Sequence, residues 1–163
     1  MSNNNSPIES HLICEDSSTG TFRYRGLNNY YSINRIAFIN FLQHNAQKHK
    51  LSQSRICFHL EDSSILQLML VFHSKTHKVK KHVHLKKDEY LHVLKGSLDV
   101  RIYNNDNEII SIISLSDEKT DDFSNLFCFL PSGVIHEVIV KRDAFFLETT
   151  TGPFDKYSTL NLL

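Results

Sequence analysis

The chain has 163 residues, 40% of them hydrophobic, and its 18 basic residues balance its 18 acidic residues. This length and apolar content predict one folded domain with a real core and exclude a chain that is disordered throughout. The zero net charge argues against a general binder of nucleic acid or of anionic membranes, and no apolar run approaches the roughly 18 residues of a membrane span. We therefore expect a small-molecule ligand, with neither nucleic acid nor membrane as a partner.

The N-terminal segment differs in composition from the rest of the chain. Residues 1–30 are rich in Asn and Ser, and we expect a flexible tail that gains a short strand around residues 21–24. Residues 31–163 then form the folded domain. Ser32 is a candidate N-cap for a helix over about residues 33–48. Four residues at helical spacing make its expected apolar face: Ile33, Ile36, Ala37 and Phe41.

From Arg55 onward the pattern changes to short runs rich in β-branched and aromatic residues. Eight such runs predict strands, at residues 56–60, 66–72, 90–94, 98–103, 109–113, 126–130, 135–140 and 144–148. The Asn-rich residues 104–107 predict a hairpin turn, and residues 114–124 predict a polar loop. Many short strands separated by turns indicate a sandwich or a barrel.

The cysteines and the N-terminus bear on location. The three cysteines have no regular spacing, and Cys57 and Cys128 lie in apolar runs where buried thiols are expected. Residues 1–18 contain no apolar stretch of the kind that a secretory signal carries. These features predict a cytoplasmic protein.

Two patterns about fifty residues apart predict a metal site. His82 and His84 are two apart, so on a strand they share one face, and the four residues before Glu89 suffice for a tight connection to a return strand. Residues 131–133 predict a turn that delivers His136 onto a later strand. Three imidazoles and a carboxylate are a usual ligand set for a divalent transition metal such as Fe, Mn, Zn, Ni or Co. Two alternatives remain: ordinary histidines, or a metal with a purely structural role.

In these residues the chain resembles the cupin superfamily. Residues 82–96 match its first motif, H-x-H, three or four residues, E, six residues, G, and residues 131–136 match P-x-G-x2-H of its second motif. Thr76 and Asn125 stand where the motifs have glycine, and Val140 stands where the second motif often ends in Asn. None of these departures removes a ligand. The resemblance implies an all-β fold, a single cupin jelly-roll β-barrel with an N-terminal helix.

Over residues 33–157 the chain resembles more narrowly the WbuC-type cupins, which are encoded among genes for bacterial O-antigen, lipopolysaccharide and other surface polysaccharide synthesis. The matching features are residues 54–55 followed by His59, and Glu148 followed by residues 152–154. The resemblance implies a metal-binding cupin that pairs as a homodimer and acts on a sugar or nucleotide-sugar.

Glu148 ends an otherwise apolar strand, where a carboxylate must be exposed, paired or catalytic. In one interpretation it forms a buried ion pair with Arg55 or Arg101. In the other it is the catalytic residue, doing general acid–base work beside the metal. Arg55, His59 and Tyr103 are candidate pocket residues.

The remaining polar residues leave alternatives open. His73 and His77 precede the first motif in an expected loop, where solvated side chains are predicted. Six lysines flank the His82–His84 strand and form either a solvated face or a rim that attracts an anionic substrate: Lys75, Lys78, Lys80, Lys81, Lys86 and Lys87.

Two functions are compatible with these patterns. The first is a metal-dependent enzyme, an isomerase or epimerase that uses the metal as a Lewis acid, or an oxygenase. The second is a non-catalytic module that binds a sugar or another small molecule. An enzyme turns its ligand over, whereas a module only binds it.

Overall fold

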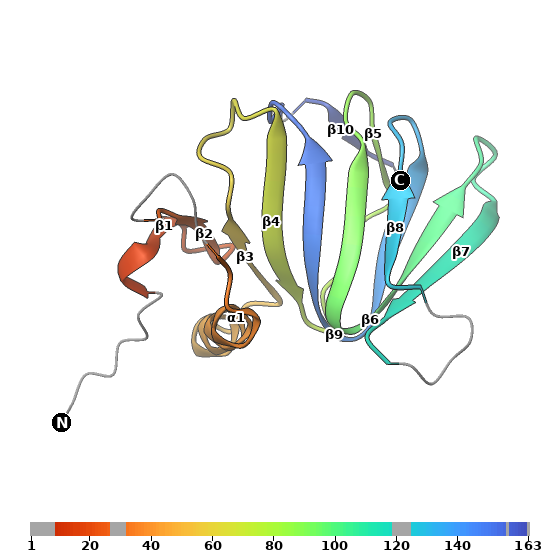
Figure 1. Cartoon of the computed structure of the whole chain (residues 1–163). Coiled ribbons are helices and arrows are strands. Elements are labelled where there is room, and N and C mark those ends of the chain that lie inside the picture. Colours follow the sequence, from red (N-terminus) through yellow and green to blue (C-terminus); the bar gives the residue numbers. More distant parts are fainter. Residues whose placement is uncertain (1–8, 27–31, 119–124, 156, 163) are drawn as a thin grey trace.

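The computed structural model describes residues 9–26, 32–118, 125–155 and 157–162. Within these residues one α-helix, one short 3-10 helix and ten strands are present (Figure 1). Their bounds are η1 Glu9–His11, β1 Leu12–Asp16, β2 Thr21–Tyr24, α1 Arg35–His49, β3 Gln53–Cys57, β4 Leu66–His73, β5 His82–His84, β6 Glu89–Tyr103, β7 Ile109–Ser116, β8 Phe127–Leu130, β9 Ile135–Thr151 and β10 Thr159–Asn161.

The two long strands β6 and β9 pair with each other along most of their length and connect two sheets. The first part of β6 pairs with β8, and the last part of β9 pairs with β4, which continues to β3, β2 and β1. The last part of β6 pairs with β7, and the first part of β9 pairs with β5, which continues to β10. The register between β6 and β9 shifts between Val93 and Leu98, where one sheet passes into the other.

Gly96 lies at this transition and its backbone has a φ of +91°. A Cβ atom at this position would lie 2.0 Å from the carbonyl oxygen of Asp143 on β9. Only glycine allows both the left-handed backbone and this close approach of the two strands. The glycine that closes the first motif therefore belongs to the bend, not to the ligand set.

The helix α1 covers the outer face of β3, β4 and β9. Asn34 caps its start, because its side chain accepts a hydrogen bond from the Ala37 amide, and the helix ends at the left-handed Lys50. The expected N-cap, Ser32, lies two residues earlier. The expected apolar face was wrong in part, since Ile36 is 71% exposed. The buried residues of the helix are Phe38, Ile39, Leu42 and Ala46.

A second apolar cluster fills the space between the sheets. Its buried members come from β4, β6, β7, β8 and β9: Val71, Leu91, Val93, Leu98, Val100, Leu115, Cys128, Leu130, Val138, Val140, Ala144 and Phe146. The helix lies on the outer face of the strands, and the apolar residues fill the space between the sheets. This arrangement confirms the expected all-β jelly roll with an N-terminal helix, although the sheet does not close on itself. In the described residues no helix is long and apolar enough to cross a membrane.

Two parts of the chain differ from the sequence-based expectation. Residues 90–94 and 98–103 belong to one strand, β6, and residues 135–140 and 144–148 to another, β9, because bulges continue the pairing across the bends. The strand expected around residues 21–24 is present as β2, but it forms an unexpected hairpin with β1 and pairs in parallel with β3. The tail predicted for residues 1–30 lies outside the described residues at 1–8 and 27–30.

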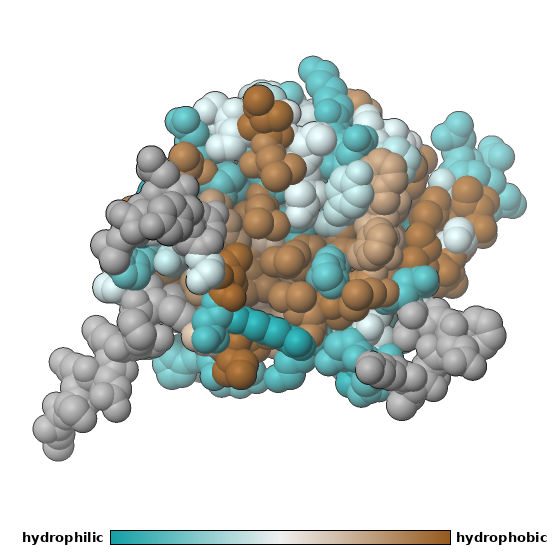
Figure 2. Space-filling model, viewed as in Figure 1, coloured by the Kyte–Doolittle hydropathy of each residue, from teal (hydrophilic) through white to brown (hydrophobic). Residues whose placement is uncertain are grey.

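Figure 2 shows apolar residues gathered over the strands on the face viewed. Several large apolar side chains of β7 and β8 are exposed in the chain on its own: Ile109, Ile110, Ile112, Phe127 and Phe129.

Candidate metal centre

Three strands bring the four predicted ligands together. His82 pairs with His136 in the register between β5 and β9, and Glu89 is the first residue of β6. Alternation along β5 places His84 on the same side as His82. All four side chains are buried, and the ligand atoms that they offer lie within 4.8 Å of one another.

Each of the three histidines makes a hydrogen bond through its Nδ1 atom, and this bond orients the ring. These bonds join Nδ1 of His82 to the Lys80 carbonyl oxygen (2.7 Å), Nδ1 of His84 to the Thr159 hydroxyl (2.9 Å) and Nδ1 of His136 to the Val134 carbonyl oxygen (3.1 Å). A ring that donates from Nδ1 to a carbonyl keeps its Nε2 lone pair for a metal. Fixed tautomers of this kind are usual around metal-binding histidines.

The carboxylate of Glu89 lies among the Nε2 atoms. Its Oε2 is 3.2 Å from Nε2 of His84 and 3.1 Å from Nε2 of His136. The His136 nitrogen is fully buried and makes no hydrogen bond of acceptable geometry within the described residues. A buried nitrogen without a partner, beside a carboxylate and two further imidazoles, fits a divalent metal ion.

The charge states of His82 and Glu89 also suit a metal. Burial, with a smaller contribution from His136, lowers the pKa of His82 to about 4, so its imidazole is neutral at pH 7, as a ligand must be. Burial alone would raise the pKa of Glu89, but the contacts with His136 and His84 outweigh it and hold that pKa below its ordinary value. Glu89 is therefore an ionised carboxylate in the site.

The turn after β8 is fixed to the loop after β5. The Val134 amide donates to the Pro131 carbonyl, as the predicted turn requires, and the Gly133 amide donates to the His84 carbonyl at 2.7 Å. The Ser132 amide donates to the side chain of Asp88 at 2.9 Å. The bonds from Gly133 and Ser132 hold the two motifs in register, because each joins one motif directly to the other.

Three of the four residues, His82, His84 and Glu89, border an inner cavity of about 200 Å³. Its other lining residues are Gln53, Arg55, Val71, His73, His77, Val79, Leu91, Val138, Phe146 and Glu148. The interpretation of His73 as a solvated loop residue was wrong, because β4 continues through it and leaves it only 7% exposed. Its ring lies 4.0 Å from that of His77, and burial, followed by His77, holds its pKa well below the ordinary value.

An outer cavity of about 240 Å³ lies next to the first and shares Arg55 and Glu148 with it. Its other lining residues are Glu15, Thr21, Arg23, Cys57, His59, Asp62, Gln67, Met69, Lys87, Thr150 and Phe154. The register explains the shared wall. Arg55 pairs with Val71, which pairs with Phe146, and Glu148 is two residues further along β9 on the same face.

Glu148 forms no ion pair with either expected partner within the described residues. Arg101 lies 3.6 Å from Glu137 instead, on the other face of the sheet. Burial, followed by the charge of Glu89, raises the pKa of Glu148 to about 7. The side chain thus faces both cavities as a carboxyl group that titrates near neutrality.

Of the remaining pocket candidates, two line a cavity and one does not. Arg55 lines both cavities and His59 lines the outer one. Tyr103 lines neither of them: its hydroxyl donates to Glu137 at 2.7 Å. Ile102 pairs with His136, so alternation sends the next residue, Tyr103, to the opposite face.

Sequence reasoning missed Gln53 and His73 as cavity residues, and it did not separate Lys87 from the neighbouring lysines. For His73 a signal was present. It continues the alternation of Met69 and Val71, whose side chains face the interior, but the expected strand ended one residue too early.

Comparison with known proteins bears on the fold. A family model described as a domain of unknown function, DUF6016, matches residues 36–115. None of the curated proteins compared matches the chain. Among solved structures, protein SO0799 from Shewanella oneidensis has a TM-score of 0.51 at 15% identity, with 64% of this chain and 67% of that chain covered.

Two larger proteins share the fold. CapF, solved with the inhibitor 3-isopropenyl-tropolone, has a TM-score of 0.55 at 18% identity and covers 68% of this chain, which spans 32% of the CapF chain. A point mutant of the oxalate decarboxylase OxdC from Bacillus subtilis has a TM-score of 0.51 at 21% identity and covers 68% of this chain, which spans 28% of OxdC. These similarities show a cupin fold. Together with the buried His-His-Glu-His cluster, they support a metal-binding cupin.

Proposed function

We propose that this protein is a metal-dependent enzyme that acts on a sugar or nucleotide-sugar. One observation carries the proposal: the cluster of three oriented imidazoles and an ionised carboxylate reaches a cavity through His82, His84 and Glu89, and the same cavity contains the unpaired carboxyl group of Glu148. A purely structural metal site has no need of a cavity or of a titratable group facing it.

The proposal of a sugar ligand rests on the resemblance to WbuC-type cupins. By the same resemblance, the substrate would be an intermediate in the synthesis of O-antigen, lipopolysaccharide or another surface polysaccharide. The mixed lining of the outer cavity supports a hydroxyl-rich ligand, because polar side chains such as Gln67, Thr150 and Asp62 stand beside apolar ones such as Met69 and Phe154. The resemblance to cupins supports a homodimer, and three cysteines without regular spacing favour a cytoplasmic location.

His82, His84, Glu89 and His136 would hold the ion, and four protein ligands leave room for a substrate oxygen. When bound, a divalent ion supplies Lewis-acid polarisation of a carbonyl or, if it is iron, oxygen chemistry. Glu148 would accept a proton from the substrate and return it, since a carboxyl group with a pKa of about 7 can do both at neutral pH. Isomerisation or epimerisation beside a carbonyl is the reaction class that uses these parts most directly.

The test is to incubate the protein, loaded with its own metal, with a panel of nucleotide-sugars and to follow each by NMR. An enzyme converts at least one of them, and Glu148→Gln abolishes conversion while binding persists. Glu108→Gln, in the exposed hairpin, serves as the control variant and should convert like the wild type. Binding shifts without any product in the wild type would instead make the protein a non-catalytic sugar-binding module.

A further inference from the structure

The two cavities share Arg55 and Glu148, and Lys87 lines the outer cavity. Each cavity alone is smaller than the roughly 300 Å³ at which small-molecule pockets usually begin. A ligand that reaches the metal and fills the available space therefore spans both and passes Arg55 and Glu148. We propose that Arg55 and Lys87 form an anion-binding subsite at this junction, and that the substrate carries a carboxylate or a phosphate. This inference rests on the proposed function, because it concerns the same ligand.

Arg55 is half-buried on β3, yet its guanidinium is almost unused. Within the described residues its side chain makes one hydrogen bond, to Oε1 of Gln53 at 3.4 Å, and no ion pair. Its charge nevertheless lies close enough to oppose part of the rise in the pKa of Glu148, and it adds to the effect of burial in lowering the pKa of His77. A guanidinium with its donors free can bind a carboxylate or a phosphate through two parallel hydrogen bonds.

Arg23, in the same outer cavity, shows what a satisfied arginine looks like in this protein. It is bound by both carboxylate oxygens of Glu15, by Asp62 at 2.8 Å, and by the His59 carbonyl at 3.1 Å. Its charge is offset within the fold. The contrast with Arg55 indicates that the second arginine is held for a group from outside the chain.

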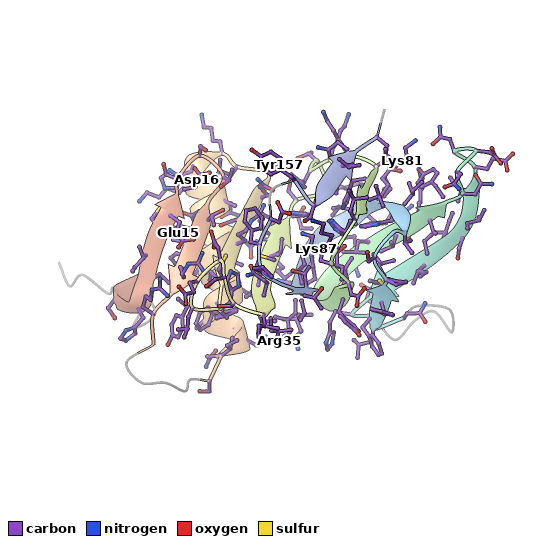
Figure 3. All side chains as sticks on the ribbon, turned by 90° about the horizontal axis from the view of Figure 1, so that it is seen from above. Glu15, Asp16, Arg35, Lys81, Lys87 and Tyr157 are labelled. Atoms are coloured by element: carbon purple, nitrogen blue, oxygen red, sulfur yellow. The ribbon has the colours of Figure 1, made fainter. Side chains whose placement is uncertain are left out.

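Lys87 lies in the loop between β5 and β6, two residues before Glu89. It is half-buried and lines the outer cavity, and in the described part of the chain its ammonium group has no hydrogen bond or ion pair. In Figure 3 it lies near the centre of the molecule, between Glu15 on one side and Lys81 on the other. The rim hypothesis from the sequence therefore narrows to this one lysine, since the other five line neither cavity.

The ionic contacts at the junction are unevenly shared. Arg23 takes both Glu15 and Asp62, so in the described residues no ion pair is formed by Arg55 or by Lys87. Half-buried cations without an ion-pair partner are unfavourable, because they lose hydration without a compensating contact. A bound carboxylate or phosphate would give both cations such a partner.

The test is calorimetric titration of the purified protein with D-glucuronate, D-glucose 1-phosphate and D-glucose. We expect the charged sugars to bind more tightly than glucose, and the tighter of the two identifies the anion. Arg55→Gln and Lys87→Gln should each weaken binding of the charged sugar by about tenfold or more, as the loss of a charged hydrogen bond does. Lys86→Gln, the exposed neighbour, should bind like the wild type.

Three results would overturn the subsite. Glucose and the charged sugars could bind equally well, neither charged sugar could bind, or Lys86→Gln and Lys87→Gln could lose the same binding affinity for the charged sugar. If Arg55→Gln does not fold, two other variants still test the subsite. Lys87→Gln changes only a loop residue, and Arg55→Lys keeps the positive charge on β3. Metal content of the same samples separates the two proposals. Bound metal without anion binding defeats the subsite alone, whereas anion binding through Arg55 and Lys87 without metal defeats the proposed enzyme and leaves the subsite standing.

Discussion

The two walls of the inner cavity differ in how their polar groups are satisfied. On the ligand wall, formed by β5, the start of β6 and the start of β9, every histidine has its Nδ1 bound by a neighbour and its Nε2 near Glu89 or another ring. On the opposite wall, formed by β3, β4 and the end of β9, Arg55, Glu148 and Nδ1 of His73 have weak partners or none within the described residues.

This difference separates two tasks. A metal requires ligands that are already oriented, because misplaced donors lose affinity. A substrate brings its own hydrogen-bonding groups, so the wall that receives it keeps donors and charges free until it arrives. Apart from the Nε2 atom of His136, which a metal would bind, the unsatisfied groups are therefore expected on the wall that receives the substrate.

The bend that makes the two walls face each other should show the largest effect. In Gly96→Ala the new Cβ meets the Asp143 carbonyl oxygen at 2.0 Å, in addition to the strain of a φ of +91°. We expect its loss in the free energy of unfolding to exceed the roughly 1–2 kcal/mol that a left-handed φ alone costs. Urea denaturation measures it. Gly133→Ala, with a φ of +89° and nothing within 4 Å of the new Cβ, should lose only that smaller amount; equal losses would show that the bend is not tightly packed.

Next in size is an effect on the ligand wall alone. Thr159→Val removes the hydroxyl that orients His84 through Nδ1. Such losses around a metal ligand typically weaken metal binding by about 10- to 100-fold. Titration with Co²⁺, followed by its visible absorbance, measures the affinity. Thr159→Ser keeps the hydroxyl and should bind like the wild type, so a similar loss in both variants would deny the orienting role.

The smallest effect concerns the opposite wall and depends on pH. Burial, then His77, holds the pKa of His73 well below its ordinary value, so the folded state binds fewer protons than the unfolded state. Stability should therefore fall as the pH drops below about 6.5, the unfolded pKa. Thermal unfolding at pH about 7.5 and about 5.5 should show a smaller decrease for His73→Gln than for the wild type. The exposed His44→Gln on α1 is the control, and equal decreases in the wild type and His73→Gln would contradict the account.

The ligand wall could be predicted from the sequence because its geometry is local. His82 and His84 are two apart on one strand, and a turn of defined residues precedes His136, so spacing alone fixes which side chains meet. The opposite wall is assembled from β3, β4 and the end of β9, and its members meet only through cross-strand register. Arg55 and His59 came from a family resemblance, and His73 was missed.

Two errors have a common physical origin. Local pattern placed Ile36 on the apolar face of the helix, and Tyr103 was a pocket candidate whose face the pattern did not fix; Ile36 points outward from α1, and Tyr103 points outward from β6. Near the end of an element, a shift of one residue in the boundary changes the face that a side chain occupies. The bulges in β6 and β9 were not predicted either, because the local pattern indicates two separate strands where the structure has one bulged strand.

The most direct test of the central claim is metal content by elemental mass spectrometry, on protein purified without a histidine tag. The wild type is compared with the double variant His82→Ala/His136→Ala, and His73→Ala controls for loss of a cavity histidine outside the ligand set. We predict close to one equivalent of a divalent transition metal in the wild type and in His73→Ala, and none in the double variant. Wild-type protein without metal even after reconstitution, or equal metal in the double variant, would contradict the assignment of the four residues as ligands.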